Sequence, residues 1–203
     1  MTQDVQKTMQ YLQRENIRLK AENTSLKELL TRLQKSVQAI SSLQQKIDNI
    51  RPESDVYRLI NDILNAALIA VDSENGSLLL EDEESGELVF VEVIGDARDM
   101  LMGYRLQKGV GVAGWAVEHR KAKLVEDVRR EPTFSPLVDQ VTGMQTSSLI
   151  CVPLYNEDRS LGAIEVVNTR TGRPFNDSDR DLLMLVARLA SLAIVAAERT
   201  HPT

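Results

Sequence analysis

The sequence predicts an α+β protein in which a long coiled-coil helix precedes a domain built on an antiparallel sheet. Residues 2–50 carry a heptad repeat without glycine or proline. Residues 148–155 and 161–168 are two apolar, β-branched runs of strand length, joined by five polar residues. Helical periodicity flanks the sheet region on both sides, at residues 54–71 and 176–199.

Composition and charge narrow the class of protein. A chain of 203 residues with 42% hydrophobic content suits one domain plus an appendage. The one cysteine, Cys151, excludes an intrachain disulfide and a cysteine-rich metal site. No apolar run reaches the roughly 18 residues that span a membrane, so we expect a cytoplasmic protein without a membrane partner. The net charge is +3 over residues 1–50 and −9 over the remainder, which argues against a nucleic-acid partner.

The heptad repeat predicts that residues 1–50 form a parallel, dimeric coiled coil. Asn16 and Asn23 occupy a positions, where polar residues cost stability and favour a dimer in register. The alternative is a single amphipathic helix packed on its own domain. The apolar d positions are Val5, Leu12, Leu19, Leu26, Leu33, Ile40 and Ile47. The opposite charges expected across the dimer are Glu15 with Lys20 and Glu22 with Lys27.

Pro52 is expected to end this helix, and short elements follow in alternation. We expect a helix over 54–71, a turn over 72–76 and strands over 77–81 and 87–94. An irregular segment over 96–102 should lead to a strand over 104–107 and a helix over 112–120. An edge strand over 123–128, a loop over 129–136 and a helix over 137–142 should follow.

The two apolar runs around residue 158 are expected to form the central hairpin, with residues 156–160 as its loop. Ile150, Val152 and Leu154 point to one side of the first strand. Leu149 and Cys151 point to the other, so we expect both faces of the sheet to be covered.

Glu165 interrupts the second strand, on the side shared by Leu161, Ala163 and Val167. A carboxylate there needs a partner, because an isolated buried charge is too costly. It is either the polar anchor of a ligand or half of an ion pair with an arginine such as Arg105.

The last helix is capped by Asn176, with Asp177 and Asp179 favourable in its first turn. Apolar residues cover nearly its whole circumference, so we expect it to pack on the sheet and also on a second helix or a second subunit. It is expected to end near Arg199, leaving residues 200–203 as a disordered tail.

The segment Gly109-Val-Gly111-Val-Ala-Gly114 matches the dinucleotide-binding fingerprint in letters. That fingerprint requires a buried strand before it and a βαβ unit around it. Here the preceding segment is polar and no second βα repeat exists, so we interpret the glycines as a turn that leads into a short helix.

With these segments in place, residues 55–198 resemble a GAF domain, the small-molecule sensing module of cyclic-nucleotide phosphodiesterases, phytochromes and bacterial regulators. The resemblance is carried by residues 109–115, 125–134, 148–154 and 161–168. It implies a GAF domain over 54–199 with a six-stranded antiparallel sheet, helices on both of its faces, and dimerisation through the terminal helices.

By position, the resemblance implies a ligand pocket. Glu165 is the strongest candidate, because a central strand seldom holds a carboxylate without a function. Each of the others has a structural alternative: core packing for the aromatics and the cysteine, turn capping for the aspartate, and hydrogen bonding at a strand end for the two hydroxyl residues. The implied pocket residues are Trp115, Val125, Asp127, Phe134, Thr146, Ser148, Cys151 and Glu165.

Departures from the family leave the ligand and any cofactor unidentified. Cyclic-nucleotide-binding members carry Asn-Lys after the last strand and then Phe, three residues and Asp-Glu, whereas this chain has Asn168-Thr169, Phe175 and Asp179-Arg180. Bilin binding needs a loop cysteine, and reduction of free methionine sulfoxide needs several. Haem needs an axial ligand, and both His119 and His201 lie in polar segments.

These features favour a regulatory binding module, in which a small ligand biases a dimeric coiled coil. The alternative is a structural dimerisation protein with an empty, degenerate pocket. An enzyme is disfavoured, since no nucleophile–base pair, metal cluster or phosphate loop is recognisable. No output domain is recognisable either, so the chain is expected to act on a protein partner or to be a regulatory fragment of a longer protein.

Overall fold

The computed structural model describes residues 2–51, 55–157 and 159–200, with the backbone alone at residues 2, 3, 137 and 200. It confirms an α+β fold with a six-stranded antiparallel sheet, helices on both faces and a long N-terminal helix. The chain divides into two compact units, one ending at Lys35 and the other beginning at Ser36. Helix α1 (Thr2–Asp48) contributes to both.

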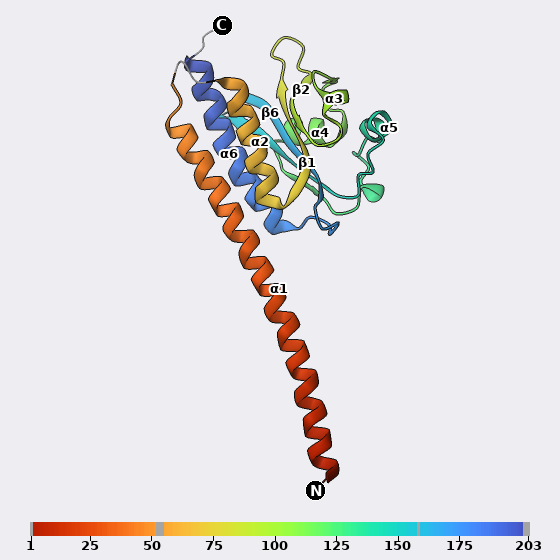
Figure 1. Cartoon of the computed structure of the whole chain (residues 1–203). Helices are drawn as coiled ribbons and strands as arrows, with labels where there is room; N and C mark the ends of the chain where they lie inside the picture. Colours follow the sequence, from red (N-terminus) through yellow and green to blue (C-terminus); the bar gives the residue numbers. More distant parts are fainter. Residues whose placement is uncertain (1, 52–54, 158, 201–203) are drawn as a thin grey trace. The chain divides into compact units, whose positions relative to one another are not determined.

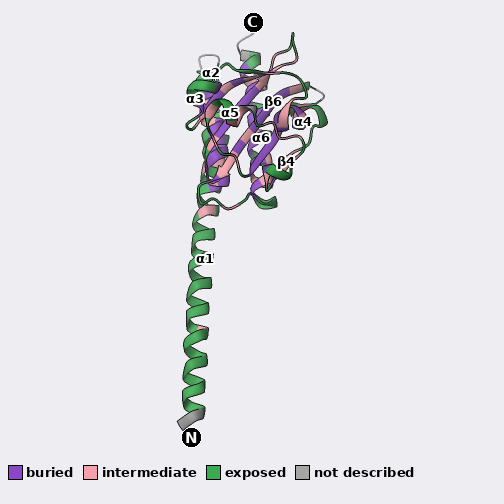
Figure 2. Cartoon of the chain, turned by 90° about the vertical axis from the view of Figure 1, so that its right-hand side faces the viewer, coloured by how far each residue is buried: buried purple, intermediate pink, exposed green. Residues whose placement is uncertain are grey.

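The first unit is a single helix without a core of its own. None of residues 4–35 is buried (Figure 2). The apolar side chains of the predicted d positions are exposed, including Leu19 at 52% and Leu26 at 58%. An apolar stripe of this length is unfavourable in water and is suited to a partner helix.

The sheet of the second unit has the order β3-β2-β1-β6-β5-β4, and each recorded pairing is antiparallel. The strands β6 and β1 lie at its centre, where both edges of each are paired. The strands are β1 (Ser73–Glu81), β2 (Leu88–Ile94), β3 (Arg105–Leu106), β4 (Lys123–Val125), β5 (Leu149–Asn156) and β6 (Arg159–Thr169).

Helices cover the two faces of the sheet in different ways (Figure 1). One face carries two long helices packed side by side, α2 (Val56–Val71) and α6 (Asp177–Thr200). The other face carries α3 (Arg98–Leu101), α4 (Gly111–His119), the 3₁₀ turn η1 (Val128–Arg130) and α5 (Leu137–Thr142).

The core forms two apolar clusters, one on each face. Ile150 and Val152 belong to the cluster under α2 and α6, whereas Leu149 and Cys151 belong to the cluster under the short helices. The predicted alternation along this strand is therefore confirmed. It follows from the period of two in a β-strand.

Residues 36–48 of α1 pack on the domain itself. Leu43 is buried in the cluster under α2 and α6. The hydroxyl of Ser36 donates a hydrogen bond of 2.8 Å to the carbonyl of Ala70, and Lys46 forms an ion pair of 2.7 Å with Asp62. Residues 36–48 therefore form an amphipathic helix packed on its own domain, which was the alternative to a coiled coil.

The prediction of a turn at residues 72–76 is wrong, because β1 already begins at Ser73. Strand β6 continues to Thr169 and supplies backbone partners for this segment, with Ser73 opposite Thr169. Gly76 marks a close approach of two strands, since a Cβ there would lie 2.8 Å from the carbonyl oxygen of Glu165.

The central hairpin is tighter than expected. Asn156 pairs with Arg159, so the strands continue through polar residues that were assigned to a loop. A register shift after Leu154 turns Leu161 toward α2 and α6, which corrects its expected position on the same side as Glu165. A bulge of this kind reverses the alternation of side chains locally.

Other boundaries shift by a few residues. Helix α2 begins at Val56, after Asp55 accepts a hydrogen bond from the backbone of Arg58. The irregular segment 96–102 contains α3, and the edge strand ends at Val125. Asn176 caps α6 as predicted, in reciprocal hydrogen bonds with Asp179. Pro52, the start expected at residue 54, and residues 201–203 of the expected tail lie outside the described residues.

The glycine motif has a packing role. A Cβ on Gly114 would lie 2.5 Å from the carbonyl carbon of Gly109, which itself has φ of +74°. The close approach of the two backbones therefore requires glycine at 114, whereas glycine at 109 is favoured by its positive φ. Separately, none of the helices in the described part of the chain is long and apolar enough to cross a membrane.

Candidate functional site

A cavity lies on the sheet face that carries the short helices. Its volume, taken as the space that the centre of a water molecule can reach, is about 70 Å³. On the same measure, one water needs roughly 10–15 Å³. From the sheet it is lined by Asn75, Gly76, Ser77, Phe90, Val93, Ile94, Leu106, Leu149, Glu165 and Val167. From the helices and loops it is lined by Ala97, Leu101, residues 110–113, Phe134, Ser135, Val138, Asp139, Met144 and Thr146.

Glu165 lies on the central strand β6 and faces this cavity. It stands between Ser77 on β1 and Cys151 on β5, which are its directly paired neighbours. Both neighbours are small, and this leaves space beside the carboxylate. Among the described residues, no hydrogen bond or ion pair to the Glu165 carboxylate is present. Burial, and secondarily the charge of Asp139, raise the pKa of Glu165 to about 7.

Asp139 brings a second carboxyl group to the cavity from α5. Its two oxygens accept hydrogen bonds from the hydroxyl of Thr146 at 2.6 Å and from the backbone N–H of Thr146 at 3.0 Å. These bonds tie α5 to the segment that leads into β5. No lysine, arginine or histidine is present among the described residues that line the cavity.

Three of the eight predicted pocket residues line this cavity: Phe134, Thr146 and Glu165. Val125 and Cys151 are instead buried in the apolar cluster beside it. The thiol of Cys151 is fully buried, and burial together with the charge of Glu165 raises its pKa well above the ordinary value. Such a thiol is a poor nucleophile, because the thiolate is the reactive form.

The other three predicted pocket residues do not line the cavity. The Trp115 ring stacks on His119 with centroids 4.5 Å apart, and Lys123 lies over it. Asp127 accepts a hydrogen bond from the backbone of Arg129 and caps η1; the Arg129 guanidinium lowers the pKa of Asp127. The hydroxyl of Ser148 is buried without a hydrogen-bond partner in the described part of the chain.

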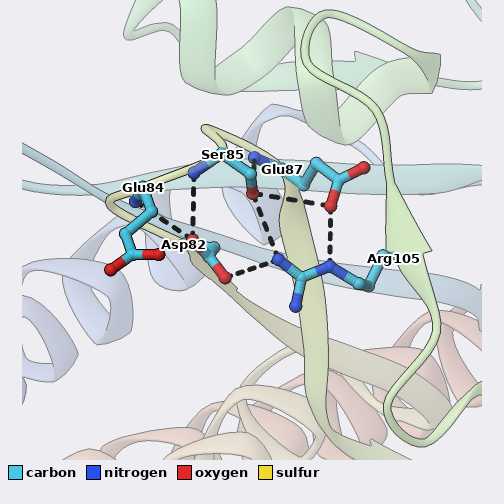
Figure 3. Close-up of polar contacts among 5 residues, drawn as sticks. All are labelled: Asp82, Glu84, Ser85, Glu87 and Arg105. Carbon is cyan, nitrogen blue, oxygen red and sulfur yellow. Dashed lines mark hydrogen bonds and ion pairs between the residues drawn. The ribbon is translucent and has the colours of Figure 1, made fainter.

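Arg105 was the expected partner of Glu165 in the ion-pair alternative, and this pairing is wrong. Figure 3 shows its guanidinium bound to Asp82 and to Glu87, around the turn between β1 and β2. The Arg105 hydrogen bond, with backbone hydrogen bonds from the turn, lowers the pKa of Asp82 to about 2. The arginine therefore ties β3 to this turn and does not pair with Glu165.

Sequence reasoning did not identify Asn75, Ser77 and Asp139 as cavity residues. Ser77 carried a usable signal, because it is a small polar residue next to the apolar run Leu78–Leu80. Asp139 carried none, since an aspartate in a short polar helix usually faces solvent. Its position beside Glu165 depends on how α5 folds back over the sheet.

A second hollow, of about 310 Å³, opens on the other face between α6 and the end of β5. Its rim includes Tyr155 and Leu192, both exposed, together with Arg120 and Arg188. It contains none of the predicted pocket residues and borders an exposed apolar side of α6. Across the described residues, no group of His, Cys, Asp and Glu forms a potential metal site.

The fold and the cavity define an α+β binding domain, in which short helices close one face of an antiparallel sheet. The GAF domain family matches residues 53–195, and the chain belongs to this family. Domains of this family are small-molecule sensing and regulatory modules.

Among curated proteins, the chain is similar to phosphodiesterases of cyclic nucleotides. It is 27% identical over 154 residues to the dual 3',5'-cyclic-AMP and -GMP phosphodiesterase 11A of Takifugu rubripes, covering 71% of this chain and 17% of that protein. The chain thus spans about a fifth of the length of the curated relatives it matches.

Solved structures share the fold. The GAF domain from a phosphoenolpyruvate-protein phosphotransferase of Coxiella burnetii superposes with a TM-score of 0.69 at 15% identity, covering 82% of this chain and 96% of that one. The free methionine-R-sulfoxide reductase of Neisseria meningitidis gives 0.67 at 20% identity, covering 81% and 90%. Structural neighbours therefore include one domain of a phosphotransferase and a reductase.

Proposed function

We propose that the protein is a dimeric regulatory sensor, which binds a small ligand in the cavity under α5 and couples binding to its coiled coil or to a protein partner. The observation that carries this proposal is Glu165. An ionisable group on a central strand, facing a cavity and lacking a protein partner, is costly to the fold and is usually retained for a function.

The chemistry available at the cavity favours binding over turnover. Cys151 is the one thiol of the sequence, and it lies buried in the apolar cluster with a raised pKa. A reductase that forms a disulfide within its own chain would need a second cysteine. We therefore propose a non-enzymatic role, although one of the structural neighbours is an enzyme.

The exposed apolar surfaces support dimerisation. The d positions of residues 4–35 would be buried by a second copy in parallel, with Asn16 and Asn23 setting the register. A second surface is available on α6, where Leu185 and Leu192 are exposed. Contact through α6 would also cover the hollow beside Tyr155.

The proposed route of coupling passes through the residues of α1 that pack on the domain. Ser36 binds the last turn of α2, and α2 packs on β1, which carries Ser77 at the cavity. A spin label on exposed Lys35 should change its distance to the same site of the second protomer when the cavity is filled. An unchanged distance would contradict coupling through this route.

The alternative is a structural dimerisation protein with an empty pocket, and the small volume of the cavity favours it. Native and denaturing mass spectrometry of the purified protein separates the two functions. We expect the wild type to release a small compound on denaturation, and Val138→Phe, which fills the cavity from α5, to release none. Val141→Phe is the matched control, because Val141 is exposed on the same helix. Retention of no compound, together with no stabilisation by any member of a metabolite library, would support the structural function.

A further inference from the structure

The charge of the cavity restricts the ligands that it can hold. Glu165 and Asp139 are the charged residues among the described lining, and both are acidic. Asp139 is engaged by Thr146 through both of its oxygens. Among the described residues, the Glu165 carboxylate has no such partner, so its ionised form would be unpaired in the cavity.

An anionic ligand is disfavoured at this site. A carboxylate or phosphate group would meet two acidic side chains in a cavity whose described lining has no lysine, arginine or histidine. Like charges brought together away from water cost several kcal/mol. The phosphate of a cyclic nucleotide would meet the same obstacle.

A metal ion is disfavoured for a different reason. Hard cations such as Ca²⁺ take six or more oxygen ligands, whereas much of this lining is apolar, including Phe90, Val93, Phe134 and Leu149. No group of three or more potential metal ligands occurs in the described part of the chain.

We infer that the cavity binds a small organic ammonium ion, with its charged nitrogen on the carboxylate of Glu165 and its apolar body against the aromatic and aliphatic lining. This inference rests on the proposed function that the cavity holds a small molecule. The available space of about 70 Å³ corresponds to roughly five waters, which limits the ligand to a short amine.

The titration of Glu165 gives the binding a pH dependence. Burial and, secondarily, the charge of Asp139 raise the pKa of Glu165 to about 7, and the ionised form is the one that pairs with an ammonium group. The Cys151 thiol also faces this carboxylate from β5, and its own pKa is raised, so it stays neutral. Lys123, on β4 beyond Cys151, is engaged by Glu131.

The expected magnitude follows from the ionised fraction of Glu165. That fraction rises about 30-fold between about pH 5.5 and about pH 8.5 for a pKa near 7, and the apparent affinity rises in proportion. The amine itself remains protonated over this range. Binding near pH 7 therefore releases about half a proton to the buffer.

Three probes of similar shape and different charge test the inference: isoamylamine, isoamyl alcohol and isovalerate. Isothermal titration calorimetry of the full chain should show binding of the amine, with an affinity that rises with pH in proportion to the ionised fraction of Glu165. The alcohol and the acid should bind more weakly or not at all. Repeating the titration in buffers of different ionisation enthalpy measures the proton release in the wild type, without any substitution.

The variant Glu165→Gln should lower the affinity for the amine roughly ten- to hundred-fold, as expected for loss of a charge-assisted hydrogen bond. It should also abolish the pH dependence of that affinity. Glu126→Gln, at an exposed site next to β4, is the control and should behave as wild type. Equal or tighter binding of the alcohol or the acid, or binding of none of the three probes, would overturn the inference. An acid or a neutral compound recovered by mass spectrometry would overturn it too, while leaving the sensor function in place.

Discussion

The substitution Glu165→Gln should stabilise the ligand-free protein at neutral and alkaline pH. Glutamine preserves the shape of the side chain and removes the ionisation. In the folded protein, burial and the charge of Asp139 raise the pKa of Glu165 from 4.5 to about 7. Because no described residue pairs with the carboxylate, the change breaks no ion pair and leaves no cation without its partner.

The sign and size of this change in stability follow from proton binding to Glu165 in the folded and unfolded states. Below about pH 4.5 both states carry the proton and Glu165 contributes no pH dependence. As the pH rises from 4.5 to 7, the unfolded chain loses the proton and the folded protein keeps it, so stability falls. Above pH 7 the full cost is present, and a shift of this size corresponds to about 3 kcal/mol. The variant lacks this cost.

Urea unfolding of both proteins at about pH 4.5 and about pH 8 measures the effect. Both proteins are compared at one concentration, because the stability of the proposed dimer would depend on it. The difference in unfolding free energy should be near zero at the lower pH and about 3 kcal/mol in favour of the variant at the higher pH. A variant that is several kcal/mol less stable than wild type at both pH values would refute the reasoning, since it would show that Glu165 pairs with a buried cation. A pH-independent difference would refute the assigned ionisation.

Three other variants and one control test the packing. Changing Leu19 and Leu26 together to Asp should convert the proposed dimer to a monomer in sedimentation velocity, and a variant that is still a dimer would exclude residues 4–35 as the main interface. Gly162→Ala should lower the free energy of unfolding by about 3 kcal/mol or more. The reason is that φ at Gly162 is +144° and the added Cβ would lie 1.9 Å from a carbonyl oxygen of β1. The control Gly172→Ala lies in open space at φ of +74° and should lower it by only about 1 kcal/mol. Ser36→Ala should cost about 1 kcal/mol in thermal unfolding through loss of its buried hydrogen bond to α2, and a neutral melt would show that this end of α1 is not held there.

The comparison of expectation with structure separates local from long-range information. The long helices, the central hairpin and the two-sided burial of β5 were predictable, because side-chain periodicity is present in neighbouring residues, whereas the short helix α3 was not predicted. Ile150 and Leu149 fall on opposite faces for this reason alone. Glu165 was identifiable in the same way, as a carboxylate in an apolar strand.

Local signals were insufficient wherever two distant segments compete for the same residues. Asn75 and Gly76 have the composition of a turn, yet β6 offers them a ladder partner and they extend β1. Arg105 was a plausible partner for Glu165 by charge, but Asp82 and Glu87 lie closer to it once β2 and β3 have paired. Strand pairing therefore decided both outcomes.

The sequence by itself determined that a carboxylate would occupy the centre of the sheet and that an apolar stripe would follow the N-terminal helix. Only the tertiary structure decided what surrounds that carboxylate. Asp139 reaches the cavity because its hydrogen bonds to Thr146 hold α5 over the sheet, and this contact between separate segments leaves no periodic trace in the sequence. The acidity of the site is consequently a property of the folded chain, since it depends on two carboxyl groups that meet only after folding.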